Sequence, residues 1–82
     1  MMAITYPSLQ KAVPQEDYTL LLTFSNGEKK LYDFRPNLNH SFYKDLTNPV
    51  LFQKVNVVDG EIEWATGQDF CPYTLYDNSV LL

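Results

Sequence analysis

Asp69 and Cys71 are the two residues of this 82-residue chain whose types and spacing most directly suggest chemistry. They follow a predicted strand and precede a predicted helix, a place where functional side chains often lie. A thiolate near a helix start has a lowered pKa, but a nucleophilic cysteine also needs a base, and the one histidine, His40, is far away in sequence. We therefore expect Cys71 to be a small, partly buried group and Asp69 to accept backbone N–H bonds in its turn.

Glu61 and Glu63 form a second candidate group, because alternate residues of a strand share one face. Asn56 is expected opposite Glu63. Paired carboxylates can transfer protons or bind a hard cation. No histidine and no convergent third ligand accompany them, so we expect a solvated face and predict no metal ion or cofactor.

Arg35 is the one arginine of the chain, and it could pair with Asp33 at the surface or anchor a protein interface. Trp64, Tyr73 and Tyr76 could stack on a base or line a groove, although aromatic residues at strand and helix spacing are more often core. No catalytic residue is predicted. The candidates for an interface or a cleft are Arg35, Trp64, Asp69, Cys71 and Tyr76.

The main element that must position these residues is a β-hairpin predicted over Tyr18–Phe34, where large apolar residues alternate. Two loops are compatible with its Ser-Asn-Gly turn. A two-residue turn would pair Leu22 with Leu31, whereas a three-residue loop with a left-handed glycine would pair Leu20 with Tyr32. The second register gathers the large apolar side chains on one face, and we favour it because a one-residue slip would move them to opposite faces.

Two further stretches predict strands. Residues 9–13 form a short strand, which would make a meander with the first hairpin. Val55–Trp64 predicts a second hairpin, because Asp59-Gly60 suits a two-residue turn that pairs Val57 with Ile62.

Short helices are expected between and after the hairpins. Residues 37–40 are predicted to be a polar loop, and residues 42–46 have apolar side chains at helical spacing. Asn48-Pro49 is typical of a helix start, with an end near Lys54, and Cys71-Pro72 is typical of another. The sequence thus predicts the α+β class, with one antiparallel sheet formed by both hairpins and the N-terminal strand, covered by two or three short helices.

Length and composition predict a single domain, 1–82, whose residues 1–7 form a loose arm or an irregular edge strand. A hydrophobic content of 45% is typical of a globular protein, and the net charge of −4 argues against nucleic-acid binding. Lys29 and Lys30 are expected in a solvent-exposed turn. One cysteine excludes an internal disulfide. No apolar run is long enough for a membrane span, so we expect a cytoplasmic protein that does not contact a membrane.

Four segments, in order, resemble a bacterial family known as domain of unknown function 2442. They are F-S-N-G-E with Asp33, then F-Y-K-D-L-T-N-P-V-L-F, then V-N-V-V-D-G-E-I-E-W, and then G-Q-D-F-C-P-Y-T-L-Y. The chain departs from the usual pattern at Cys71 and at Ala65-Thr66. The resemblance implies a small α+β domain without established catalytic residues. Some members of that family carry a C-terminal helix-turn-helix domain, which this chain lacks, and members are often encoded beside a small partner in what looks like a toxin–antitoxin pair.

These observations favour a non-catalytic protein-interaction module, in an antitoxin-like role, whose partner is the product of an adjacent gene. Exposed strand edges could bind that partner or pair two copies of the chain as a homodimer. The alternative is an enzyme or small-ligand protein with a site near Asp69 and Cys71. Direct DNA binding is the least favoured function, because the chain is acidic and lacks a helix-turn-helix.

Overall fold

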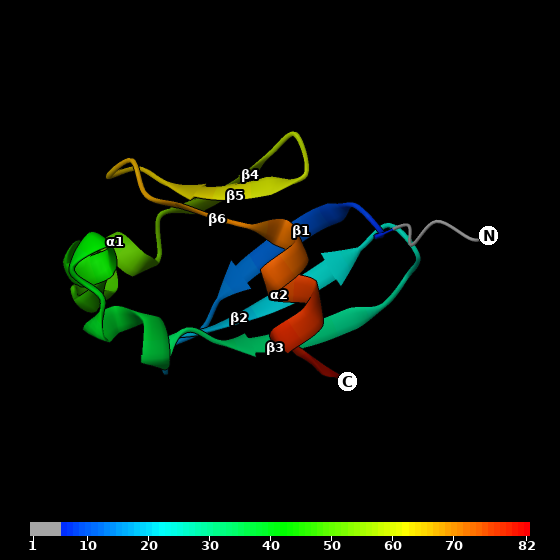
Figure 1. Ribbon diagram of the computed structural model, residues 1–82, viewed down its shortest axis with the longest axis horizontal. Coiled ribbons are helices and arrows are strands. Elements are labelled where there is room, and N and C mark those ends of the chain that lie inside the picture. The colour runs from blue at the N-terminus through cyan, green and yellow to red at the C-terminus, as the bar shows by residue number, and fades with distance from the viewer. Residues whose placement is uncertain (1–5) are drawn as a thin grey trace.

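The computed structural model describes residues 6–82, which fold into two antiparallel sheets joined by a helical segment (Figure 1). Of the arm expected at residues 1–7, all but Tyr6 and Pro7 lies outside the described residues. No helix within residues 6–82 is long and apolar enough to cross a membrane. The strands are β1 (Leu9–Pro14), β2 (Thr19–Phe24), β3 (Lys29–Asp33), β4 (Val55–Val58), β5 (Glu61–Trp64), β6 (Asp69–Phe70) and β7 (Val80–Leu81), and the helices are η1 (Arg35–Asn39) and η2 (Ser41–Thr47), both 3₁₀, and α1 (Pro49–Phe52) and α2 (Pro72–Asn78).

The first sheet has the strand order β1-β2-β3-β7, and its first three strands form the predicted meander. Leu20 lies opposite Tyr32, and the backbone N–H of Phe34 donates to the carbonyl oxygen of Tyr18. These pairs confirm the register with the three-residue loop. In that loop Gly27 has a φ of 86°, the left-handed conformation that a side chain would strain.

The second sheet has the order β4-β5-β6. Its hairpin is also confirmed, because Val57 pairs with Ile62 and the turn residues Asp59 and Gly60 have φ values of 52° and 80°, as a two-residue hairpin loop requires. The α+β class is therefore confirmed, but the strands divide between two sheets instead of forming one. Strands β6 and β7, each of two residues, extend the two sheets.

Residues 35–52, which connect the two sheets, are largely helical. The predicted polar loop at residues 37–40 was wrong for most of its length, since Arg35–Asn39 forms η1. Pro36 explains this, because its fixed φ suits the first turn of a helix. The helix predicted at residues 42–46 is present as η2, in the tighter 3₁₀ form.

Asn48 begins α1 as predicted. Its side-chain oxygen accepts a hydrogen bond of 3.0 Å from the backbone N–H of Val50, which has no partner inside the helix. The helix ends at Phe52, two residues before the expected end at Lys54.

Phe34 lies at the centre of the core that the two sheets and the helices share. It is fully buried, and its ring centroid lies 5.1 to 5.8 Å from those of Tyr43, Phe52, Trp64 and Phe70. Trp64 and Phe70 belong to the second sheet and Tyr43 and Phe52 to the helical segment, while Phe34 itself directly follows β3 of the first sheet. One aromatic cluster therefore joins all three. The buried apolar residues are Leu9, Leu20, Leu22, Phe24, Tyr32, Phe34, Leu46, Phe52, Ile62, Trp64 and Leu75.

Helix α2 packs against the first sheet beside β3 (Figure 1), with Leu75 fully buried. Lys30 lies beneath it and is only 9% exposed, so the expectation of a solvated Lys30 was wrong. In the register that pairs Leu20 with Tyr32, Lys30 pairs with Leu22, and both side chains lie on the inner face of the sheet. Lys29, on the opposite face, is exposed as expected.

Candidate binding cleft and acidic face

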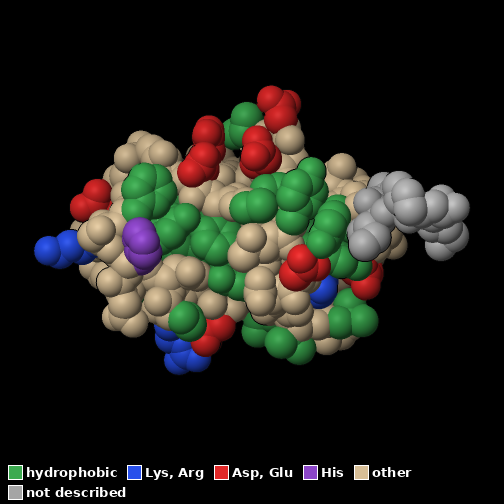
Figure 2. All heavy atoms as spheres, viewed as in Figure 1, with side chains coloured by type: hydrophobic (Ala, Val, Ile, Leu, Met, Phe, Trp, Pro, Cys, Tyr) green, Lys and Arg blue, Asp and Glu red, His purple; other side chains and the backbone are tan. Residues whose placement is uncertain are grey.

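The outer surface of the second sheet carries a concentration of carboxylates. Glu63 of β5 lies directly opposite Asp69 of β6, and Asn56 of β4 pairs with Glu63 on its other side, as predicted. Glu61 shares the face of Glu63, and Asp59 stands in the adjoining turn. We call Asp59, Glu61, Glu63 and Asp69, which line one shallow depression, the acidic face. Figure 2 shows acidic side chains, in red, gathered at the top of the molecule, where Figure 1 places the second sheet.

Strand β6 places Asp69 beside Glu63, so a third carboxylate lies on this face, a neighbour that the sequence pattern did not indicate. Like charges placed directly opposite one another on neighbouring strands destabilise a sheet. Within residues 6–82, no group of His, Cys, Asp and Glu side chains is arranged to hold a metal ion.

The acidic face has no neutralising residue in its own part of the chain. Residues 55–82 contain no Lys, Arg or His, while all six Lys and Arg residues lie within residues 11–54. The ion pair found among the described residues joins Arg35 to Asp33, at 2.8 Å, outside the acidic face. The second sheet therefore carries negative charge without a basic residue on any of its own strands.

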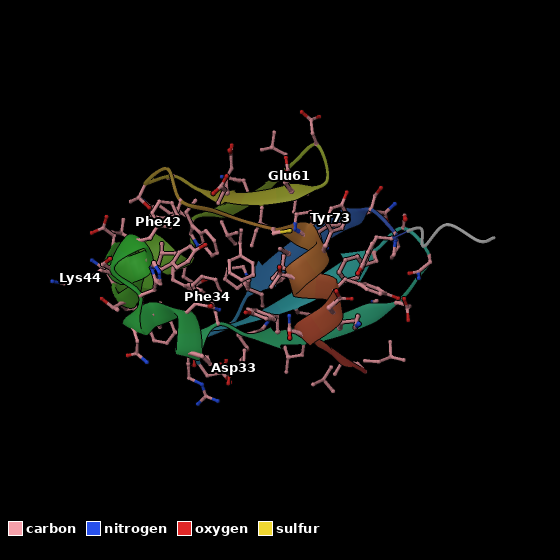
Figure 3. The ribbon with its side chains drawn as sticks, viewed as in Figure 1. Asp33, Phe34, Phe42, Lys44, Glu61 and Tyr73 are labelled. Atoms are coloured by element: carbon pink, nitrogen blue, oxygen red, sulfur yellow. The ribbon has the colours of Figure 1, made fainter. Side chains whose placement is uncertain are left out.

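A cleft of about 680 Å³ adjoins the acidic face and extends to the start of α2. Figure 3 shows Glu61 of β5 near Tyr73 of α2, and both side chains line this cleft. The cleft brings together two of the five predicted candidates, Asp69 and Cys71. Its lining consists of Tyr6, Pro7, Ser8, Tyr43, Asp59, Gly60, Glu61, Asp69, Phe70, Cys71, Pro72 and Tyr73.

Three tyrosines give the cleft its aromatic walls. The hydroxyl of Tyr43 donates to the carbonyl oxygen of Asp69 at 2.9 Å, and that of Tyr6 donates to the carboxylate of Asp77 at 2.8 Å. The rings of Tyr6 and Tyr73 lie 4.8 Å apart. Burial raises the pKa of Tyr43, and the hydrogen bond to Asp77 raises the pKa of Tyr6. Tyr6 and Tyr43 are therefore neutral phenols at pH 7.

Cys71 is exposed at the N-cap of α2, which corrects the expectation of partial burial. The backbone N–H of Thr74 favours the thiolate and so lowers the pKa of Cys71. His40 is not among the residues that line the cleft. Its Nδ1 atom instead accepts a hydrogen bond of 3.3 Å from the backbone N–H of Phe42 at the start of η2.

The carboxylate of Asp69 was expected to accept backbone N–H bonds. Within the described part of the chain, this carboxylate accepts no backbone N–H bond, and the side chain is exposed. The group of Asp69 that Tyr43 binds is instead the backbone carbonyl oxygen. The negative charge of this carboxylate is thus directed to solvent.

The other three candidates lie outside the cleft. Trp64 is 2% exposed, and its indole N–H donates to the carbonyl oxygen of Phe52 at 2.9 Å, so Trp64 belongs to the core. Tyr76 is half-buried, and its hydroxyl donates to the carboxylate of Glu28. Arg35 is exposed in its ion pair with Asp33.

Sequence reasoning missed Tyr6 and Tyr43 as cleft residues. Tyr6 falls in the segment expected to be a loose arm, where nothing in the pattern predicts a contact. Tyr43 was assigned to an apolar helix face, which accounts for its half-buried ring but not for its hydroxyl. The signal that could have located the acidic face is the absence of any basic residue after Lys54.

Comparison with known proteins gives one informative finding. The model of a family described as Protein of unknown function (DUF2442) matches residues 9–80. The match spans most of the chain and includes both hairpins, α2 and the acidic face. The searches among curated proteins and among solved structures found no match.

Proposed function

The chain belongs to the DUF2442 family of proteins of unknown function, and from this premise we propose that it is a non-catalytic module that binds a basic protein partner. The acidic face and the adjoining cleft form the proposed binding surface. The observation that carries the proposal is the direct pairing of Glu63 with Asp69 in a region without a single basic residue.

This pairing has an energetic consequence. Two carboxylates directly opposite on a sheet reduce the stability of the free protein by roughly 0.2–1 kcal/mol. A cationic partner would remove that repulsion and add its own attraction, so part of the binding energy is already stored in the free protein. The same negative potential would also speed the encounter with a basic partner.

The chemistry of the cleft favours arginine over lysine as the partner's main contact. Tyr6, Tyr43 and Tyr73 offer aromatic faces, on which a planar guanidinium stacks well. Glu61 and Asp69 line the same cleft, and a carboxylate can accept two parallel hydrogen bonds from a guanidinium.

The resemblance to a family whose members are often encoded beside a small partner protein makes an antitoxin-like role the concrete form of this proposal. The partner would then be a small basic protein from the adjacent gene. An exposed free thiol at Cys71 suits the reducing cytoplasm, where we place the complex.

The test is co-expression with the product of the adjacent gene, followed by co-purification and measurement of Kd. We expect a complex whose formation raises the thermal stability of the chain and whose affinity falls with salt. Glu63→Lys should weaken binding at least about tenfold. Glu16→Lys, which changes an exposed glutamate outside the acidic face, should leave the Kd within about twofold.

Two results would contradict the proposal: no co-purification and no rescue of growth, or equal losses for both variants. The alternative function, a small-ligand protein or enzyme, is favoured by the lowered pKa of Cys71 in a cleft. Cys71→Ser discriminates between the two, because it would abolish thiol chemistry and leave the binding of a basic partner intact.

A further inference from the structure

An apolar row crosses the outer face of the first sheet, on the side opposite the core. Val13 pairs with Leu21, Leu21 pairs with Leu31, and Leu31 pairs with Val80. Directly paired residues of neighbouring strands share one face, so these four side chains form a continuous line over β1, β2, β3 and β7. We call them the apolar row.

The apolar row faces away from the core. Residues on either side of it in sequence, such as Leu20 and Leu22, point inward and are fully buried. Val13 remains 36% exposed and Val80 67% exposed. A line of apolar side chains on the solvent side of a sheet is typical of an interaction surface.

Charges of opposite sign flank the apolar row. On one side, Lys11 and Lys29 lie in the adjacent rung of the sheet, each opposite Thr23. On the other side, Glu16 and Asp17 line a groove of about 820 Å³ together with Leu21 and Leu31 of the apolar row. Asp33 lies on this side as well, opposite Thr19, with its charge balanced by Arg35. Asp17 is held there by hydrogen bonds from the backbone N–H and the hydroxyl of Thr19.

We infer that this face binds a second copy of the same chain, with the two first sheets packed face to face. A two-fold axis parallel to the apolar row places each row on its counterpart. The same rotation carries the lysine side of one copy over the acidic side of the other, so that Lys11 faces Glu16 and Asp17 twice in each dimer. The apolar rows thus meet each other, and the charges on either side of the row are complementary between the two copies.

The charges also disfavour the other simple arrangement. An axis parallel to the strands would place Lys11 and Lys29 over the lysines of the partner copy, at a cost in repulsion. The surface of four short strands is small compared with the roughly 800 Å² per partner of a standard interface. We therefore expect a weak dimer that forms and dissociates with concentration.

This inference does not depend on the proposed function, because it concerns the opposite side of the molecule from the acidic face. Loss of the dimer would leave binding of the basic partner unchanged, and the reverse also holds. If both interactions occur, the assembly is a dimer that presents two acidic faces.

The experiment is sedimentation equilibrium of the full chain from low concentration up to about 1 mM, where a weak complex is populated. We expect the mass to rise from monomer toward dimer. Val80→Glu, in the apolar row, should keep the protein monomeric at about 1 mM. Leu81→Glu is the matched control, because Leu81 is the next residue and 58% exposed but lies on the other face of the sheet.

Charge exchange tests the geometry. Lys11→Glu should weaken the dimer, and the double variant Lys11→Glu with Glu16→Lys should restore it, since the exchanged charges again face one another across the axis. Raising the salt concentration should weaken the wild-type dimer. A monomer at every concentration, a dimer that Leu81→Glu disrupts as strongly as Val80→Glu, or a double variant weaker than the single one would each overturn the inference.

Discussion

Lys30 fastens α2 to the first sheet through Tyr76. The ammonium group of Lys30 donates a hydrogen bond of 2.5 Å to the carbonyl oxygen of Tyr76, and it lies 3.8 Å from the centroid of the same tyrosine ring. A carbonyl oxygen in the last turn of a helix has no partner inside the helix and carries partial negative charge. The ammonium group of Lys30 therefore supplies a hydrogen-bond donor to the Tyr76 carbonyl oxygen near the end of α2 and also packs against the Tyr76 ring.

Replacement of this lysine should destabilise the protein. Lys30→Met keeps the length of the side chain but removes the donor and the charge, and we expect a loss of about 1–3 kcal/mol in the free energy of unfolding. Lys29→Met is the matched control, since Lys29 is exposed on the opposite face, and it should change stability by less than about 0.5 kcal/mol. Urea denaturation measures both, and equal effects would show that Lys30 does not hold α2.

The hydroxyl of Tyr76 should make stability depend on pH. The hydrogen bond that this hydroxyl donates to Glu28 lowers the pKa of the Glu28 carboxyl below its ordinary value of 4.5. A second hydrogen bond, from the side chain of Asn26, lowers it further. A carboxylate with a lowered pKa in the folded state contributes stability above its unfolded pKa, and this contribution is lost as the pH falls through the folded value. Tyr76→Phe should thus be less stable than wild type at pH 7, and the difference should shrink below about pH 4.

The same hydrogen bond raises the pKa of Tyr76 above 10.0, so its contribution is present at neutral pH and is lost only as the pH rises through that raised value. Tyr18→Phe provides the control, because the Tyr18 hydroxyl donates to the carbonyl oxygen of Thr47, which does not titrate. Thermal unfolding across pH 3–8 compares the variants. Parallel pH profiles for Tyr76→Phe and wild type would contradict the assignment.

Truncation of the central phenylalanine should nearly unfold the chain. Phe34→Ala empties the middle of the aromatic cluster, and such a change costs about 3–5 kcal/mol, a large fraction of the stability of a small domain. Phe42→Ala is a control of the same chemistry, because Phe42 is 51% exposed. It should cost less than about 1 kcal/mol. Figure 3 shows the two side chains in these contrasting positions, and chemical denaturation with circular dichroism separates them.

Neutralising one carboxylate of the acidic face should have opposite effects on stability and binding. Glu63→Gln removes the repulsion with Asp69 and should raise the free energy of unfolding by roughly 0.2–1 kcal/mol. The same change should weaken the complex with the basic partner, as expected where stability has been given up for function. Glu16→Gln removes an equal charge elsewhere and should do neither. A less stable Glu63→Gln protein would contradict this account of the acidic face.

The hairpins could be predicted because their turns and their alternation agree. At the first hairpin, only the three-residue loop puts the apolar side chains of Leu20 and Tyr32 on one face, and the structure has that register. At the second, Asp59-Gly60 determined the pairing of Val57 with Ile62. In both cases local turn chemistry and burial favour the same pairing.

The separation into two sheets could not be predicted, because alternation within a hairpin does not specify which strand edges pair with another hairpin. Strands β6 and β7, which extend the two sheets, are too short for alternation to appear. The acidic face depends on β6, so the position of Asp69 opposite Glu63 escaped prediction for the same reason. Lys30 was misassigned although the favoured register already placed it on the inner face. Charged residues are rarely buried, and the tyrosine that makes burial possible lies 46 residues away in sequence.

The position of Trp64 has a practical consequence. It is the only tryptophan, and its indole is hydrogen-bonded where α1 ends against the second sheet. Its fluorescence emission consequently reports whether α1 and the second sheet remain in contact. If the second sheet separates from the helical segment before the three-stranded meander unfolds, the emission of Trp64 will shift to the red before the far-ultraviolet ellipticity is lost. The folding cooperativity of the two sheets can thus be measured without an added label.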